Sequence, residues 1–378
     1  MDVQATWEIL RVFEELPDPR RTNCRHRLID MLTIALLAVI CGADGWAAVE
    51  TYGKAKAPWL KTFLELPSGI PSHDTFGRVF ARLNPEAFEA CFRRWIATLV
   101  ELSGGKLLAI DGKSIRRSFT QGWDKIGMAH MVSAFVQANH MVFGQIKTEG
   151  KGQELSAIEK LLEVLDLNGA VVTIDALGCQ KDIAAAIKKA HGDYVLQVKD
   201  NQPTLLAKMQ TVFTEARLEN FASYRADSIK TLDADNGRIE TRRAWVLWDI
   251  KHLGAMAKDW PGLRSLVMVE RTREVNGKVS VEVHYYISSL DARRTAAQFL
   301  EYIRGHWSVE NNLHWQLDVS FDEDQRRIRK GHGAENFSRL CRMALNLLKN
   351  EPTHKNGIAI RRQNCGWEND YLLKVLIG

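Results

Sequence analysis

Three acidic residues of this chain have the type and surroundings of ligands for divalent metal ions: Asp111 in LLAIDGKS, Asp175 in VVTIDALG and Glu310 in HWSVENNLHW. The two aspartates directly follow short apolar runs, which predict buried strands of a mostly parallel sheet. An aspartate at the carboxyl end of such a strand lies at the edge where open α/β sheets bind ligands. Gly112 and Gly178 follow within three residues, so the chain is expected to turn there.

The three carboxylates predict a site for two-metal phosphoryl transfer. Cutting or joining a phosphodiester needs a nucleophilic oxygen, an in-line leaving oxygen and charge relief at phosphorus, which two divalent ions about 4 Å apart can supply. Carboxylates are the hard ligands that hold Mg²⁺, and Mn²⁺ is expected to substitute. We expect Asp111 and Asp175 to activate the attacking water and Glu310 to complete the second metal site. The predicted catalytic and metal-binding residues are therefore the same three.

The segment around Glu310 predicts a helix that faces this site. At 100° per residue His306 and Glu310 share a face, with Trp307 and His314 close beside it. A buried helix face would not carry these groups without partners, because burying an unpaired charge is costly. Trp307 is expected either to stack on a base near the scissile phosphate or to be a core residue. Trp315 is assigned to the core.

Composition favours an intracellular protein that binds a polyanion. The formal charge is only +5, from 51 basic and 46 acidic residues, but two local runs are strongly basic. Either a polyanion partner or a solvated face would explain them. The runs are Arg20, Arg21, Arg25, His26 and Arg27, then Arg326, Arg327, Arg329, Lys330 and His332.

Other classes of protein lack support in the sequence. The six cysteines are scattered without C-x-x-C spacing, which is typical of reduced thiols in a cytosolic protein. The start of the chain is not a secretory signal, and the apolar run from Met31 to Cys41 is too short for a membrane span, so a buried helix and a cytoplasmic location are expected. Gly112-Lys113-Ser114 resembles the end of a Walker A loop, but the first glycine of that motif would fall at position 107, which is leucine. Zinc protease, serine hydrolase and dinucleotide motifs do not occur.

The order of expected elements predicts an α/β protein with a ribonuclease H-like catalytic core, a β-rich insertion and an N-terminal helical domain. Apolar residues recur at helical spacing up to a linker at Ser103-Gly104-Gly105. A strand and a hairpin at Ala138-Asn139 follow, then alternating helices and strands. The domains expected are 1–102, helical and DNA-binding; 103–214, the first part of the core; 215–298, the insertion; 299–349, the rest of the core with the Glu310 helix; and 350–378, a tail.

Long stretches of the chain resemble the DDE transposases of bacterial insertion sequences, in the ISAs-type group that includes the H-repeat-associated proteins linked to Rhs elements. The resemblance spans nearly the whole chain. It rests on AIDGKSIRRS, VSAFVQANHMVFGQIKT, TIDALGCQKDIA, DYVLQVKDNQ, NGRIETR, IRGHWSVENNLHWQLDVSFDED and, near the start, LPDPRRTNCRHRLIDMLTIALLAVICGADGW and GIPSHDTFGRVF.

The resemblance implies magnesium-dependent cutting and strand transfer at the ends of a mobile element, with Asp111, Asp175 and Glu310 matching the catalytic triad. It also implies double-stranded DNA as partner, at element ends and target, and a homodimer that pairs two ends. The residues expected to contact DNA are Lys113, Arg116, Arg238, Arg304, His306, Trp307, Asn311 and His314.

One signature of the broader group is missing. That group often carries Tyr, Arg and Lys at seven before, four before and seven after the glutamate, where this chain has Ile303, His306 and Leu317. This chain therefore matches the catalytic triad of the family but not this signature. Two other functions stay open: a domesticated or inactive DNA-binding protein that keeps the fold, and a nuclease without strand transfer.

Overall fold

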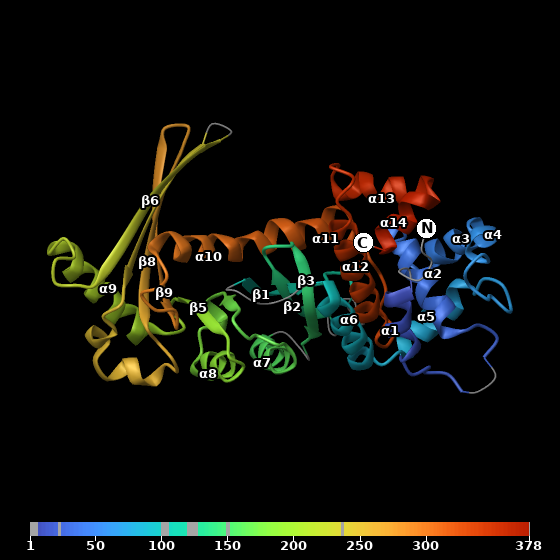
Figure 1. The fold of residues 1–378 in the computed structure, drawn as a ribbon, viewed down its shortest axis with the longest axis horizontal. Coiled ribbons are helices and arrows are strands. Elements are labelled where there is room, and N and C mark those ends of the chain that lie inside the picture. Colours follow the sequence, from blue (N-terminus) through green and yellow to red (C-terminus); the bar gives the residue numbers. More distant parts are fainter. Residues whose placement is uncertain are drawn as a thin grey trace. The chain divides into compact units, whose positions relative to one another are not determined.

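A computed structural model describes residues 7–21, 24–99, 106–118, 128–148, 152–235 and 238–377 (Figure 1). The expected linker at Ser103-Gly104-Gly105 lies outside these residues. The chain forms two compact units: unit 1 comprises Met1–Glu101, Gly112–Ala157 and Glu310–Gly378, and unit 2 comprises Leu102–Asp111 and Ile158–Val309. The units group the segments differently from the expected domains, whose boundaries stay a prediction.

Unit 1 is mainly helical and is built around one largely apolar helix, α2. Nearly every residue of α2 is buried, as expected for a helix that is apolar on most sides, and the buried Asp30 carboxylate accepts a hydrogen bond from the N–H of Leu66 at 3.1 Å. This confirms the buried helix predicted from Met31 to Cys41. The elements are α1 (Trp7–Glu14), α2 (Leu28–Ile40), α3 (Trp46–Ala55), α4 (Ala57–Leu60), α5 (His73–Arg82), α6 (Pro85–Leu99), β2 (His130–Val136), β3 (Met141–Lys147), a π-helix (Glu310–His314), α11 (Trp315–Val319), a 3-10 helix (Glu323–Gln325), α12 (Gly333–Asn350), α13 (Ile358–Trp367) and α14 (Asn369–Ile377).

Local sequence signals explain where several of these helices begin. Ser72 precedes α5 and its hydroxyl accepts a hydrogen bond from the backbone N–H of Thr75. Asn84 precedes Pro85, the first residue of α6, and accepts a hydrogen bond from the N–H of Ala87 at 2.8 Å, as an N-cap residue does.

Helix α12 is buried along most of its length although its sequence is rich in polar residues. Its polar side chains satisfy backbone groups of other elements. The Asn336 amide donates to the carbonyls of Phe80 and Leu83 at 2.9 Å, at the end of α5. Asn346 accepts from the N–H of Val142 in β3 and donates to its carbonyl, at 2.9 and 2.8 Å. These bonds fix α5 and the β2–β3 hairpin against α12, because a buried polar group is costly when unpaired.

Two buried ion pairs extend this network. Arg339 in α12 donates to Glu89 in α6 at 2.7 Å, and Glu89 also accepts from the N–H of Gln145 in β3. Arg342 donates to Glu323 at 2.8 Å. Burial opposes ionisation of Glu323, but the adjacent guanidinium charge outweighs it and holds the pKa of Glu323 below its usual value. The charges are therefore paired where the dielectric is low.

Unit 2 is organised on a mixed sheet with strand order β1-β4-β5-β9-β8-β7-β6. β1, β4 and β5 are parallel to one another, and the remaining strands pair antiparallel. The elements are β4 (Val171–Ile174), a 3-10 helix (Ala176–Gly178), α8 (Lys181–Lys189), β5 (Asp193–Val198), α9 (Pro203–Leu218), β6 (Ala226–Asp235), β7 (Arg238–Leu247), a 3-10 segment (Ile250–Asp259), β8 (Ser265–Val275), β9 (Lys278–Ser288) and α10 (Ala296–Val309), while β1 (Leu107–Ser114) and α7 (Glu154–Val164) cross the division between the units.

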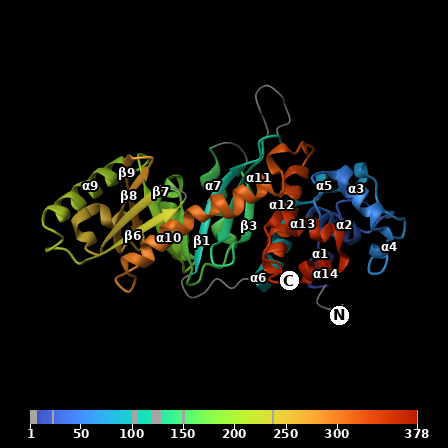
Figure 2. The same ribbon diagram turned by 90° about the horizontal axis from the view of Figure 1, so that it is seen from above.

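Helices cover both faces of the antiparallel part of this sheet, as Figure 2 shows for α9 and α10. Successive residues of a strand point to opposite faces, so Tyr285 and Tyr286 of β9 contact different helices. The ring of Tyr285 lies 5.9 Å from that of Phe213 in α9. Tyr286 belongs to the core cluster that contains Phe299 and Ile303 of α10.

The secondary structure agrees with most of the expected elements and contains others that the sequence did not indicate. The hairpin turn of β2 and β3 is confirmed. A second tight turn, at Asn276-Gly277, joins β8 to β9, and both of its residues have the positive φ that such a hairpin requires. The sequence did not indicate α9 or β6, nor α13 and α14 in the segment 350–378 that was expected to be a tail. No helix in the described ranges has the length and apolar character needed to cross a bilayer. All six cysteines are free thiols.

We expect Arg339→Met to lower the free energy of unfolding by about 3 to 5 kcal/mol, because it leaves the Glu89 carboxylate buried without its main cation. Urea denaturation followed by circular dichroism measures this loss. The matched control is the double variant Glu89→Met/Arg339→Met, which removes both charges and should lose much less. If Arg339→Met is as stable as the double variant, then leaving Glu89 without Arg339 has no cost, and the prediction is contradicted.

Candidate active site

The parallel pairing of β1 with β4 brings two of the predicted acids to neighbouring positions. The register pairs Ile110 with Ile174 at the end of the ladder. Asp111 and Asp175 are the next residues on the two strands. Because adjacent strands lie about 4.8 Å apart, the two backbones are close enough for both carboxylates to reach one ion.

Both aspartates lie on the face of the sheet that α10 covers. Leu107 and Val171 belong to the core cluster formed with α10. Asp111 and Asp175 follow them by four residues, an even number, so the alternation along each strand directs their side chains to the same face. Asp111 is half-buried and Asp175 is exposed.

A tight turn fixes the backbone after Asp175. Its carboxylate accepts a hydrogen bond from the N–H of Leu177 at 3.1 Å and caps a single 3-10 turn. Gly178 closes this turn so near to β4 that a Cβ at that position would lie 2.2 Å from Ile174 Cγ2. The glycine that the sequence marked as a turn residue is therefore required for close packing.

His306 joins α10 to β4 beside Asp175. Its Nδ1 lies 3.1 Å from the hydroxyl of Thr173, two residues before the aspartate. Burial lowers the pKa of His306 to about 4, and the charge of Asp175 opposes this shift. The imidazole is therefore neutral at pH 7. The sequence predicted a DNA contact for His306, and its observed contact is with the sheet.

Trp307 lines two small cavities between α10 and the sheet of unit 2. One is bounded by Thr173, Gln197, Tyr286 and His306 among others, and the second by arginines of β7, β8 and α10. The Arg271 guanidinium lies 5.0 Å from the Trp307 ring centroid. This cation–π contact occupies one side of the ring. Stacking of Trp307 on a base stays a prediction.

Glu310 begins a π-helix directly after α10, in unit 1. Its side chain is exposed. A π-turn leaves carbonyls without their usual helical partners and occurs frequently at functional sites. Here Lys349 of α12 donates to the carbonyls of Asn312 and His140, at 2.8 and 2.7 Å. Burial lowers the pKa of Lys349 to about 7. That Glu310 joins the two aspartates stays a prediction.

Several predicted DNA contacts have acidic partners within the protein. Lys113 pairs with Asp318 at 2.6 Å and Arg304 pairs with Asp233 at 3.2 Å. These cations are partly neutralised before any DNA binds. Arg116 and Arg238 lie near Asp324 and Glu240, at 3.1 and 3.6 Å.

The remaining predictions on the Glu310 segment have mixed outcomes. Asn311 is exposed and His314 is half-buried, and their DNA contacts stay predictions. The assignment of Trp315 to the core was wrong, since 53% of it is exposed. The wider π-turn before it changes the angular position of every later residue, which helical spacing alone does not reveal. Lys349 was missed because a lysine near a helix end reads as a surface residue.

The two aspartates suit a divalent ion such as Mg²⁺, which commonly uses one or two carboxylates and keeps several waters. Within the described part of either unit, no three His, Cys, Asp or Glu side chains form a cluster that could hold a metal. The donor chemistry of Asp111 and Asp175 nevertheless fits a hard cation, because both supply carboxylate oxygens.

The comparisons with known proteins agree along the whole chain. The model of the family "Transposase DDE domain" matches residues 102–347, and the model "DDE_Tnp_1-associated" matches residues 10–96. The chain is 40% identical over all of its length to 95% of "Putative transposase YncI" of Escherichia coli O157:H7. It is 38% identical to "H repeat-associated putative transposase YhhI" of Escherichia coli K12, over 96% of each protein.

A solved structure of a "piggyBac transposase synaptic complex with hairpin DNA" aligns with 96% of this chain and 81% of that chain. The sequence identity is 11% and the TM-score is 0.36.

The stability of the folded chain should fall as the pH is lowered from about 6.5 to about 4, because the unfolded chain binds a proton at His306 before the folded chain does. The contribution of His306 between pH 7 and pH 5 is at most about 2 kcal/mol. Urea denaturation at both pH values measures it. His306→Gln keeps a polar group next to Thr173 but cannot titrate, so its stability should depend less on pH. Equal pH dependence in both proteins would contradict this prediction.

Proposed function

Since this chain belongs to the DDE transposase family, we propose that it cuts DNA at the ends of an insertion sequence and joins those ends to target DNA by metal-dependent phosphoryl transfer. The main observation in support of this proposal is the parallel pairing of β1 with β4, because it brings Asp111 and Asp175 to neighbouring positions at the ends of the two paired segments. The family match covers both strands and the segment that contains Glu310.

The proposed catalytic core is ribonuclease H-like. In support, an antiparallel hairpin, β2 and β3, follows the strand of Asp111 in sequence, and β4 with Asp175 lies parallel to β1. The long antiparallel strands β6 to β9 then separate the second acid from the third along the chain. We take these strands as the insertion within the core.

In this proposal Asp111, Asp175 and Glu310 hold Mg²⁺ or Mn²⁺. Bound ions would supply positive charge at the phosphate that is attacked. The aspartates contribute by position: the strand register sets their spacing, and the turn at Gly178 keeps Asp175 at the sheet edge. His306 contributes by packing, because its contact with Thr173 fixes the end of α10 four residues before Glu310.

The proposed partner is double-stranded DNA, both at the element ends and at the target. Two ends must be held together for joining, so the active form is proposed to be a homodimer. The DNA for the tests is a duplex with the sequence that flanks the gene, where this proposal places the inverted repeats of the element.

Asp175→Asn should reduce Mg²⁺-dependent cleavage of this duplex by about 10²-fold or more. The variant lacks a carboxylate proposed to hold the metal ions, and those ions would stabilise the charge of the transition state. Asparagine keeps a carbonyl oxygen that can accept from Leu177, so the turn should persist. Denaturing gels measure nicking, and fluorescence anisotropy measures binding, which should change little.

The matched control is Asp182→Asn, an exposed acid in the first turn of α8. It should cleave like the wild type. Full nicking by Asp175→Asn would remove that residue from the mechanism. A wild type that binds the duplex with or without Mg²⁺ and never nicks it would identify a DNA-binding protein instead.

Glu310→Gln should abolish cleavage without lowering stability, because the side chain is exposed and its loss leaves no buried group unpaired. It should also weaken binding of Mn²⁺ to the DNA complex, which electron paramagnetic resonance measures independently of activity. Glu301→Gln, an exposed acid of α10, is the control. If both variants bind Mn²⁺ and cleave alike, Glu310 is not a metal ligand.

A further inference from the structure

Three segments far apart in the sequence meet on one side of unit 1 and together expose eight basic residues. Hydrogen bonds to backbone carbonyls hold them together: the Arg329 guanidinium donates to the carbonyl of Arg117 at 3.2 Å, and the N–H of His332 donates to the carbonyl of Ala81 at 3.0 Å. We call this set the basic surface. It consists of Arg78 and Arg82 from α5, Arg116 and Arg117 after β1, and Arg327, Arg329, Lys330 and His332 before α12.

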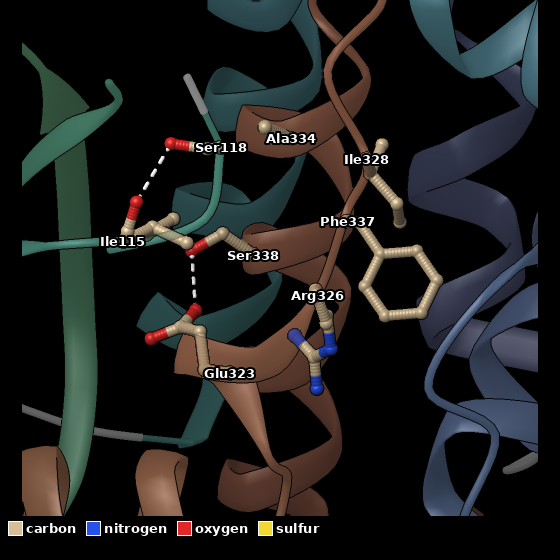
Figure 3. A pocket seen from close by; sticks show the side chains of 8 residues that line it. All are labelled: Ile115, Ser118, Glu323, Arg326, Ile328, Ala334, Phe337 and Ser338. Carbon is tan, nitrogen blue, oxygen red and sulfur yellow. Dashed lines mark hydrogen bonds between the residues drawn. The ribbon is translucent and has the colours of Figure 1, made fainter. Parts of the chain in front are cut away.

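A small cavity beneath the basic surface shows how two of the segments are joined (Figure 3). Ile115 and Ser118 line one side of the cavity and Ala334 and Ser338 of α12 line another. The Ser118 hydroxyl donates to the carbonyl of Ile115 at 2.8 Å and tightens the turn that presents the first two arginines after β1. Glu323 and Arg326 also line the cavity and are buried, whereas the basic side chains on either side of it are exposed.

The segment before α12 is fixed to α5 by a close backbone approach. Gly331 has a φ of 52°, and a Cβ there would lie 2.4 Å from the carbonyl oxygen of Ala81. No other residue type permits this contact without displacing the chain. The backbone that carries Arg329 and Lys330 is therefore held in place before any partner binds, which lowers the entropic cost of binding.

Arg326, which the sequence grouped with this basic run, has a different role. Its side chain is buried, and its guanidinium donates to Cys341 Sγ at 2.9 Å and to the carbonyl of Phe321. It also lies 4.7 Å from the ring centroid of Phe337. Arg326 therefore anchors the segment from inside, and the surface charge comes from the residues that follow it.

The basic surface keeps most of its charge. Asp324 pairs with Arg116 at 3.1 Å, and Asp74 lies exposed in the first turn of α5. Within the ranges that the structure describes, no carboxylate pairs with the side chain of Arg82, Arg117, Arg327 or Lys330. Like charges brought together without counter-ions are destabilising, so their retention points to an anionic partner.

We infer that the basic surface binds the phosphate backbone of duplex DNA outside the reacting site. The inference rests on the proposed function, since it gives that reaction a second place of DNA contact. Most of the exposed cations are arginines, whose planar donors match phosphate oxygens. The proposed reaction acts on double-stranded DNA, so the phosphates offered to these cations belong to a duplex backbone.

The test neutralises three of these cations in the variant Arg82→Gln/Arg327→Gln/Lys330→Gln. Anisotropy with a labelled duplex is measured from 50 to 300 mM NaCl, in the background of Asp175→Asn to prevent cleavage. If each residue neutralises one phosphate, the slope of log affinity against log salt should become shallower by about 2 to 3. Affinity at the lowest salt should fall by at least tenfold.

The matched control, Lys61→Gln/Lys355→Gln/Lys374→Gln, removes the same charge from exposed lysines of unit 1. Lys355 follows the opposite end of α12, about 25 Å along the helix axis from the basic surface. Circular dichroism shows whether each variant is folded. The inference is overturned if both triple variants have the same slope and affinity, or if polyglutamate displaces the duplex at equal charge concentration.

These results separate the inference from the proposed function. A changed slope in the triple variant together with a wild type that never cleaves would retain the basic surface and overturn the transposase reaction. Normal cleavage by the wild type together with an unchanged slope in the triple variant would retain the transposase reaction and overturn the role of the basic surface.

Discussion

The parallel register between β1 and β4 is the constraint on which the candidate site depends. A shift of one residue would turn every side chain of one strand to the other face, so Asp111 and Asp175 would no longer share a side. The apolar residues four positions earlier, Leu107 and Val171, hold the register because they belong to the core under α10. The same packing that stabilises the sheet thus aligns the carboxylates.

Unit 1 depends on a different kind of interaction, namely polar groups buried along α12. Arginine and asparagine side chains at intervals of three or four residues connect this helix to α5, α6, β3 and the segment before the helix. Such groups are costly to bury unless every partner is present, so the network tolerates few alternative packings. It positions both the basic surface at one end of α12 and Lys349 near the other.

Charge is distributed unequally between the candidate site and the basic surface. Two cations that the sequence assigned to DNA contact, Lys113 and Arg304, already have carboxylate partners, which limits the net attraction they offer to a phosphate. On the basic surface, Arg82, Arg327 and Lys330 have none among the described residues. This difference would let DNA affinity come from one surface while the carboxylates remain available for metal ions.

The sequence alone determined the family, the order of the elements around the two aspartates and the turn residues that follow them. These features are local: an apolar run that ends at an acid, a glycine after it and a hairpin dipeptide all act within a few residues. The tertiary structure decided what depends on distant partners. It paired Lys113 with Asp318, buried Arg326 and exposed Trp315 after a π-turn. Burial and pairing are set by neighbours from remote segments, so charge runs and helical angles in the sequence could not reveal them.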